Sequence, residues 1–269
     1  KKKKPPPVCR VFYFFFCSAL NNIKSLIMSR LTTSKFRNLK GGAFKRDAWY
    51  PDLNVSNTTT EGTIISASPL WIAVLWGTPT GGSLGVLGHG EYGKRKRNVP
   101  LIHAHPQPIN DFQWNPYFDW HLATASTDAT VKLWKLPEDG LSDDLTVPDG
   151  TLKGHGKRVD VLQWHPSACN VLASGGGDNT VRIWDSSVEQ EKLVIEGFKD
   201  SIWGLAWSYD GSLLAVTSKD KKIRLVDPRA KSFVQVINLL GHFDAIIFSK
   251  INLNYEINSI NYKKKKNLR

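Results

Sequence analysis

The sequence feature that most constrains the fold is a pattern of four residues that occurs twice at the same spacing. The two sets are His105, Thr124, Asp128 and Trp134, and then His155, Ser174, Asp178 and Trp184, each member fifty residues after its counterpart. A third segment keeps the aspartate of this pattern as Asp220, and also has Trp207 and Asp227 in the places of Trp164 and Asp185. It has Phe198 in place of the histidine, Val216 in place of the hydroxyl residue and Val226 in place of the tryptophan. Recurrence at this period indicates that the chain is built from stacked structural repeats.

The second copy shows what kind of unit repeats. It opens with Gly154-His155, closes with Trp184-Asp185, and holds the short apolar runs DVLQW, NVLAS and TVRIW, separated by the turn-forming segments HPSA and GGDN. This arrangement resembles the WD repeat, in which each unit contributes four short antiparallel strands to a β-propeller blade. The sequence therefore predicts an all-β fold, a WD-repeat β-propeller that is incomplete, with about four of the seven blades that the resemblance implies.

A histidine, a hydroxyl and a carboxylate in one module also match the composition of a catalytic triad. A nucleophile must face a substrate cleft beside an oxyanion-stabilising group, once per protein, whereas this set recurs at identical spacing. The resemblance to WD repeats assigns both sets instead to structural tetrads, whose buried hydrogen bonds pin a tight turn to neighbouring strands. We therefore expect no catalytic residue and no enzymatic activity. The alternative is an enzyme that uses His155, Ser174 and Asp178, which predicts reaction of Ser174 with a serine-directed probe.

The repeats divide the chain into seven segments. We predict a non-native or disordered leader at 1–27, a basic segment at 28–48, a divergent first blade at 49–100, a WD repeat at 101–150, a second WD repeat at 151–192, a degenerate repeat at 193–235, and, at 236–269, the broken-off start of a fourth repeat with a disordered tail rich in asparagine and lysine. In the first blade, strands at 70–76 and 83–87 flank the glycine-rich turn GTPTGG.

The N-terminal leader does not have the repeat pattern. Its lysine cluster and apolar run outline a secretory signal peptide, but Met28 is the only methionine and favours an upstream extension. The run from Val11 to Leu20 is shorter than the roughly 20 residues of a membrane-spanning helix, so we expect no membrane span. Three cysteines without a metal-ligand spacing, and no phosphate-binding glycine loop, predict no metal, no cofactor and a reducing, cytoplasmic location.

The net charge of +12 is unevenly distributed along the chain. Residues 28–100 hold ten basic and four acidic side chains, whereas residues 101–242 hold fourteen and eighteen. A basic surface of this kind favours contact with an acidic partner, although a run such as 94–97 is also compatible with a solvated loop. The candidate partner-binding residues are Lys35, Arg37, Arg46, Lys94, Arg95, Lys96 and Arg97.

The sequence after Met28 narrows the resemblance to one family. Ser34-Lys35-Phe36-Arg37, the stretch GHGKRVDVLQWHPSACNVL and the Asp227-Pro228-Arg229 end of the degenerate repeat are similar to coronins, over roughly residues 28–242. Coronins are WD-repeat proteins that bind actin. The Arg-Asp-Ala-Trp sequence at 46–49 resembles the long, two-propeller branch of that family, and the broken-off repeat indicates a truncated N-terminal propeller portion.

The resemblance implies a scaffold of the actin cytoskeleton in the cytoplasm. Its implied partners are filamentous actin, the branched-filament nucleating complex and other proteins bound to a propeller face, and no nucleic acid. One position departs from the family, because Asn54 stands where conventional coronins have an arginine important for filament binding, within an Asp-Ile-Arg-Val-Ser stretch. The alternative is a generic WD-repeat adaptor, including one with a trafficking role, that does not bind actin.

Overall fold

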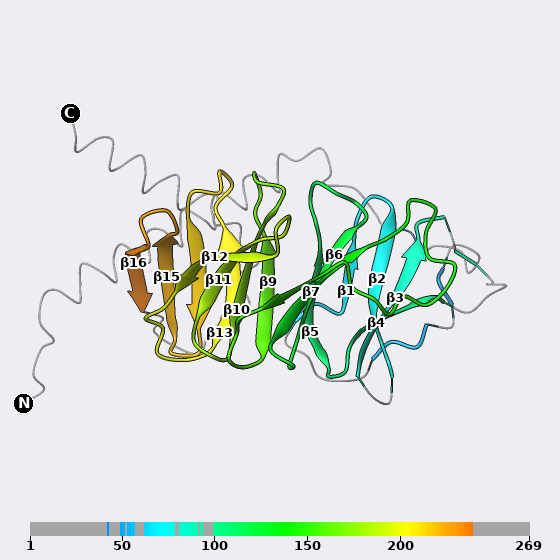
Figure 1. The fold of residues 1–269 in the computed structure, drawn as a ribbon, viewed down its shortest axis with the longest axis horizontal. Coiled ribbons are helices and arrows are strands. Elements are labelled where there is room, and N and C mark those ends of the chain that lie inside the picture. Colours follow the sequence, from blue (N-terminus) through cyan, green and yellow to red (C-terminus); the bar gives the residue numbers. More distant parts are fainter. Residues whose placement is uncertain are drawn as a thin grey trace, which may run out of the picture. The chain divides into compact units, whose positions relative to one another are not determined.

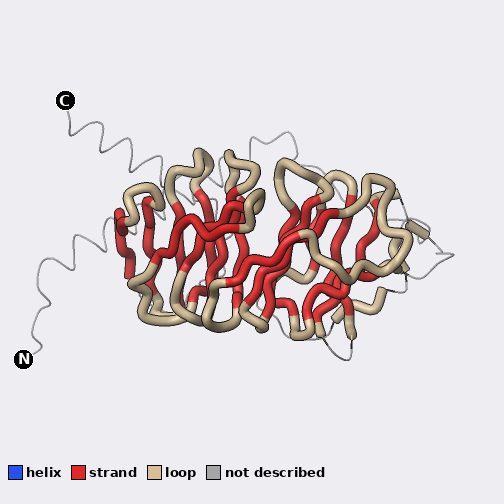
Figure 2. The backbone as a smooth tube through the Cα atoms, viewed as in Figure 1, coloured by secondary structure: helices blue, strands red, loops and turns tan. Residues whose placement is uncertain are grey.

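The computed structural model describes residues 42, 49–51, 53–56, 62–78, 81–90, 92–93 and 99–238. Within these residues the regular structure consists of sixteen strands, and Figure 2 shows them joined by turns and loops. The strands form four sheets of four antiparallel strands each, with the strands of each sheet consecutive in the chain (Figure 1). The predicted all-β fold is therefore confirmed.

The strands have the following bounds. The first sheet contains β1 (Ile65–Ala67), β2 (Trp71–Trp76), β3 (Gly82–Gly88) and β4 (Leu101–His105), and the second contains β5 (Ile109–Trp114), β6 (His121–Ser126), β7 (Thr130–Lys135) and β8 (Gly150–Lys153). The third sheet contains β9 (Val159–Trp164), β10 (Val171–Gly176), β11 (Val181–Asp185) and β12 (Gln190–Ile195), and the fourth contains β13 (Ile202–Trp207), β14 (Leu214–Ser218), β15 (Lys222–Asp227) and β16 (Ser232–Asn238).

The sheets are offset from the sequence repeats by one strand. The histidine that opens the first repeat, His105, lies at the end of β4, which is the outer strand of the preceding sheet. His155 likewise follows β8, the outer strand of the second sheet. Each repeat therefore spans two sheets and connects one sheet to the next through covalent structure as well as through packing.

Three apolar cores lie between successive sheets. In the second sheet, Leu122 packs toward the first sheet, whereas the next residue, Ala123, packs toward the third. Both side chains are fully buried. Because successive residues of a strand point to opposite faces, a sheet covered on both faces needs an apolar residue at nearly every position of its middle strands. This explains why β10, and β6 after His121, are continuous runs of small and aliphatic residues.

The first strands of the sheets are also joined by a repeated hydrogen bond. The indole Nε1 of Trp114 donates to the carbonyl of Ser66 (3.1 Å), that of Trp164 to Gln113 (3.1 Å), and that of Trp207 to Gln163 (3.3 Å). Each tryptophan ends the first strand of its sheet and reaches the first strand of the sheet before it. A large apolar ring and a directional bond thus stabilise every described junction.

The outer edge of the first sheet is covered by a loop from the second. In the loop between β7 and β8, Leu145 forms a parallel bridge with Ile102 of β4, through backbone bonds of 2.8 Å to Leu101 and 2.9 Å to His103. The neighbouring Asp144 accepts a hydrogen bond from the backbone N–H of Leu101 at 2.9 Å. Pairing of this kind occupies the backbone groups of an edge strand that would otherwise be open to another chain.

The divergent first blade has its strands where the sequence predicts them. The predicted strands at 70–76 and 83–87 correspond to β2 and β3, and the turn between them places Gly81 at a φ of 78°. Glycine adopts this left-handed conformation without the steric cost that a Cβ atom brings. The predicted leader, nearly all of the segment 28–48 and the tail beyond Asn238 lie outside the described residues.

Candidate functional site

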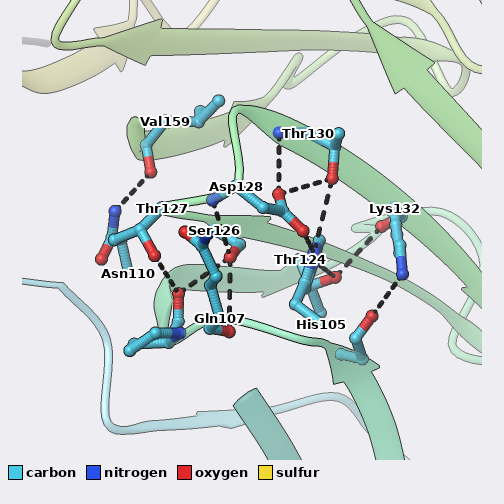
Figure 3. Close-up of polar contacts among 12 residues, drawn as sticks. His105, Gln107, Asn110, Thr124, Ser126, Thr127, Asp128, Thr130, Lys132 and Val159 are labelled. Atoms are coloured by element: carbon cyan, nitrogen blue, oxygen red, sulfur yellow. Dashed lines mark hydrogen bonds and ion pairs between the residues drawn. The ribbon is translucent and has the colours of Figure 1, made fainter. Parts of the chain in front are cut away.

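The first predicted tetrad forms a connected chain of hydrogen bonds in the second sheet. The His105 ring, at the end of β4, bonds through Nδ1 to Asp128 Oδ2 (2.8 Å) and through Nε2 to Thr124 Oγ1 (2.9 Å). The Trp134 indole donates to the same Thr124 oxygen at 3.0 Å. Figure 3 shows His105 beside both Thr124 of β6 and Asp128 of the turn that follows it.

The second tetrad repeats this geometry in the third sheet. The His155 ring lies 2.9 Å from Asp178 Oδ2 and 2.7 Å from Ser174 Oγ, and the Trp184 indole donates to Ser174 Oγ at 2.8 Å. Asp178 also accepts the backbone N–H of Gly156 at 3.0 Å. The equivalence of the two tetrads extends to the turn, because Ala129 and Asn179 both have positive φ.

The bond pattern of these tetrads leaves no reactive hydroxyl. With the histidine neutral and its Nδ1–H directed at the aspartate, Nε2 accepts the hydroxyl proton and the hydroxyl oxygen accepts the indole N–H. Ser174 and Thr124 are both fully buried. A nucleophile must reach a substrate in a cleft, whereas each hydroxyl here lies at the centre of a closed network. The arrangement is suited to holding the turn between two strands against the preceding outer strand.

Electrostatics within the tetrads agree with this assignment. Burial lowers the pKa of His105, against the opposing effect of Asp128, which favours the neutral ring that the hydrogen-bond chain requires. Burial acts to raise the pKa of Asp128, but hydrogen bonds from Thr130 and His105 prevail and lower it. The carboxylate therefore remains ionised and accepts the donors of its turn, as Figure 3 shows for Thr130.

The fourth sheet has an ion pair where the second and third sheets each have a tetrad. Arg224 of β15 bonds to Asp220 through two nitrogen atoms, at 2.5 and 3.2 Å, and donates to Ser218 Oγ at 3.2 Å. Its guanidinium lies over the ring of Phe198, 5.3 Å from the centroid. Phe198 is the residue at the histidine position of this repeat. The degenerate repeat has thus replaced one buried polar network with another.

Arg224 was not identified from the sequence. The register pairs it with Val216, just as Lys132 is paired with Thr124 and Arg182 with Ser174 in the sheets before it. A basic residue at this position is therefore common to the three repeats. The signal that could have found it is the loss of the histidine, hydroxyl and tryptophan while Asp220 is retained, since a buried carboxylate needs another partner.

Asp111 is a second buried polar residue that the repeat pattern did not reveal. It is 3% exposed, and its two oxygens accept backbone N–H groups of Phe112 (3.0 Å), Leu162 (2.9 Å) and Thr63 (3.4 Å). These donors belong to the second sheet, the third sheet and the segment before β1. Burial raises the pKa of Asp111, against the lowering effect of these bonds. The carboxylate joins the second sheet, the third sheet and the segment before β1 at one point.

None of the predicted basic contact residues belongs to the described part of the chain. Lys35, Arg37, Arg46 and the run Lys94–Arg97 all lie outside it. Asn54, at the position of the coronin arginine, is exposed beside the end of β2, where its Nδ2 donates to the carbonyl of Gly77 at 2.8 Å. Its side chain thus supports the start of the turn between β2 and β3.

Two further findings concern the described residues alone. They contain no group of three or more histidine, cysteine, aspartate or glutamate side chains placed to hold a metal ion. Among the same residues there is no helix with the length and apolar character needed to cross a membrane.

Four antiparallel four-stranded sheets, packed in chain order, with His–hydroxyl–Asp–Trp networks in the second and third sheets, define a WD-repeat propeller protein. The family model "WD domain, G-beta repeat" matches residues 96–135, 146–185 and 189–227, and the model "Domain of unknown function (DUF1899)" matches residues 29–94. The chain belongs to the coronin family, of whose N-terminal region it has both parts. This family is generally non-catalytic.

Individual coronins support this assignment. The chain is 33% identical to human Coronin-2A over 215 residues, which are 78% of this chain and 41% of that protein. It is 38% identical to bovine Coronin-7 over 199 residues (73% and 22%) and 35% identical to the coronin-like protein crn1 of Schizosaccharomyces pombe over 218 residues (79% and 35%). It therefore spans less than half the length of each.

A solved structure agrees with the fold as well as the family. The WD40 domain of Toxoplasma gondii coronin superimposes with a TM-score of 0.71 at 35% sequence identity, covering 76% of this chain and 52% of that one. The expected membership of the coronin family is confirmed.

Proposed function

We propose that this chain is a scaffold that binds actin filaments and acts in organising the actin cytoskeleton. The observation that carries the proposal is its membership of the coronin family across both the DUF1899 segment and the WD repeats. The buried state of both tetrads supports a binding role, since their hydroxyl groups serve the fold. A cytoplasmic, cytoskeletal location belongs to the same proposal, as does recruitment of the branched-filament nucleating complex.

The basic N-terminal portion provides the first group of proposed filament contacts. Its members are Lys35, Arg37, Arg46, Lys94, Arg95, Lys96 and Arg97, within a stretch that holds ten basic and four acidic side chains between residues 28 and 100. The actin filament presents an acidic surface, and complementary charge raises the association rate and the specificity of binding. Asn54 does not carry the positive charge of the family's arginine, and these basic residues supply positive charge in its stead.

Co-sedimentation with actin filaments tests the proposal. The full chain is centrifuged with filaments at low and moderate salt, beside a variant in which residues 94–97 are changed to alanine. We expect the wild-type chain to pellet with filaments at low salt and less at moderate salt, because exposed charges are screened beyond about 8–10 Å at 0.1–0.15 M salt. The alanine variant should pellet less at low salt.

The result that contradicts actin binding is equally clear. A folded wild-type chain that stays in the supernatant at both salt concentrations excludes filament binding by this chain. Capture of another cytoplasmic protein by the same preparation then indicates a general WD-repeat adaptor. Circular dichroism of each preparation confirms that it is folded before it is compared.

A further inference from the structure

The outer strand of the fourth sheet, β16, is exposed along its whole length. It pairs with β15 on one side, and no described strand lies on its other side (Figure 1). All seven of its residues are exposed, although Phe233, Val234, Val236 and Ile237 are apolar. A strand in this position presents a row of backbone N–H and C=O groups with which another strand can pair.

The outer strands of the other three sheets are each protected at this edge. The edge of β4 is paired with Leu145 of the β7–β8 loop. On β8, the backbone N–H of Thr151 donates at 3.1 Å to the carboxylate of Glu189, which lies in the β11–β12 turn of the next sheet. β12 carries two exposed charged residues, Glu191 and Lys192. Covering an edge and charging an edge both hinder its pairing with another chain.

The registers show where β16 differs from β12. In both strands the pairing with the neighbouring strand skips one residue, which is Lys192 in β12 and Val234 in β16. The residue before it is Glu191 in β12, where it forms an ion pair with Arg182, and Phe233 in β16. Phe233 and Val234 are 40% and 44% exposed. β16 therefore presents apolar side chains at the two positions where β12 presents charges.

The sequence of β16 is compatible with pairing to a copy of itself. None of its seven residues is charged, and its central stretch, FVQVI, has the same order of apolar and polar residues in both directions. Two antiparallel copies centred on Gln235 place Val234 opposite Val236 and bring no like charges together. A two-fold contact uses the same surface on both partners, so the surface must be complementary to itself. The edge of β16 meets this requirement.

We propose that β16 is a self-association edge, at which two copies of this chain pair their β16 strands in antiparallel orientation. The two fourth sheets then form one continuous sheet across the two-fold axis. Backbone hydrogen bonds between the strands orient the pair, as in other cases of strand addition at a sheet edge. Contact among Phe233, Val234 and Val236 of the two copies removes apolar area from water. This contact is separate from the proposed binding of actin.

Sedimentation velocity of the full chain over a range of protein concentrations tests the proposal. The test variant is Val234→Lys, which gives β16 the residue that β12 has at the corresponding position. The matched control is Val147→Lys, the same change at a residue that is 74% exposed in the β7–β8 loop. We expect the wild-type chain to dimerise. The dissociation constant should rise about tenfold or more for Val234→Lys and change less than about threefold for the control, because a lysine on a sheet edge opposes pairing.

Hydrogen exchange locates the contact. The backbone amides of β16 in the wild-type chain should exchange more slowly as the protein concentration rises, whereas those of β12 should not change. A wild-type chain that stays monomeric at every concentration overturns the proposal. Dimerisation that is equally strong in Val234→Lys also overturns it, because the interface then lies elsewhere.

A further outcome concerns another occupant of the edge. Slow exchange of the β16 amides in a monomeric chain would show that a segment of the same chain covers the edge, and would overturn self-association. None of these measurements contains actin. Their failure therefore leaves the proposed function untouched, and failure of filament binding leaves the self-association edge untouched.

Discussion

The hydroxyl at the centre of each tetrad is the residue on which the network depends most. Replacing Ser174 by alanine leaves His155 Nε2 and the Trp184 indole N–H without their shared partner in a fully buried site. Each orphaned buried group costs on the order of 1–3 kcal/mol, so for two such groups we expect Ser174→Ala to lower the free energy of unfolding by about 2–6 kcal/mol. Urea denaturation followed by circular dichroism measures the change.

A serine outside the networks gives the matched control for this variant. Ser187 is exposed in the turn between β11 and β12, and its hydroxyl donates to the partly exposed Asp185 carboxylate. Ser187→Ala should change the stability by no more than about 0.5 kcal/mol. Equal stability of the Ser174 variant and the wild-type chain would show that the tetrad contributes nothing, and would reopen a reactive role for that hydroxyl.

The histidine of the first tetrad makes stability depend on pH. Burial lowers the pKa of His105 below the 6.5 of a free histidine, so the unfolded chain binds a proton that the native chain does not. Stability is then fully present above pH 6.5 and decreases as the pH falls below it, with a slope of at most about 1.4 kcal/mol per pH unit for one group. The pKa of His121 is lowered by burial too and adds to this loss.

Urea titrations at pH 7.5, 6 and 5 measure this dependence. We expect the free energy of unfolding of the wild-type chain to fall across the series. His105→Asn should be less stable at pH 7.5 but should lose less on acidification, because the titrating ring is gone. Constant stability of the wild-type chain between pH 7.5 and 5 would contradict the assignment of a neutral, buried His105.

At the level of the β-strands, we expect the loss of an arginine to destabilise the fourth sheet more than the third. Arg224 of β15 is buried with Asp220, whereas the corresponding Arg182 of β11 pairs with Glu191, whose side chain is 32% exposed. Removing one partner of a buried ion pair costs about 3–5 kcal/mol, because the other charge stays buried and unpaired. The Arg182–Glu191 pair is more accessible to solvent, with side chains 16% and 32% exposed, and solvent weakens such a pair, down to about 1 kcal/mol or less when it is fully exposed. We therefore expect Arg224→Met to be much more destabilising than Arg182→Met.

A second substitution tests whether the unpaired carboxylate is the cause. Adding Asp220→Asn to the Arg224→Met chain removes the buried charge, so the double variant should be more stable than the single Arg224 variant. Thermal denaturation of all four chains provides the comparison. Similar losses for Arg224→Met and Arg182→Met, or no recovery in the double variant, would mean that the ion pair does not stabilise the fourth sheet.

The same elements show how far the sequence predicts this structure. The repeat spacing predicts the strands and brings together each tetrad, because those residues recur at fixed positions. The repeat spacing does not predict the role of Arg224, because its position relative to its partner follows only from the β14–β15 register. The spacing does not predict the role of Asp111 either. The residues at its position in the next two repeats, Val161 and Gly204, are not polar, and the N–H groups that bind it come from three separate segments. Contacts unique to one repeat need the three-dimensional packing.

At the scale of the whole molecule, the distribution of surface charge also depends on the three-dimensional structure. The sequence indicates a basic N-terminal portion and an acidic remainder, but it does not indicate which end of the sheets each charge occupies. Loop direction decides that: the acids of the β7–β8 loop lie at one end, and the lysines that follow β8, β12 and β14 lie at the other. A chain segment with an overall negative charge thus presents a positive surface at one end.

The junctions between sheets determine how the molecule unfolds. Each described sheet contacts only its sequence neighbours through its core, so stability depends on nearest-neighbour interfaces, as in repeat proteins. Trp164 lies in the middle junction, where it is buried and donates to Gln113 of the sheet before it. Trp164→Phe keeps most of the apolar area but orphans that carbonyl, and should cost about 1–3 kcal/mol.

The steepness of the unfolding transition tests the role of this junction more directly than the loss of stability does. A weakened middle junction lets the sheets on either side unfold separately, so the urea dependence of unfolding should become shallower and fluorescence and circular dichroism should no longer give coincident transitions. Trp203→Phe is the control, since this ring is partly exposed and faces Lys219. If Trp164→Phe shifts the midpoint while the transition stays as steep as in the wild-type chain, the sheets unfold as one unit and the junction does not limit cooperativity.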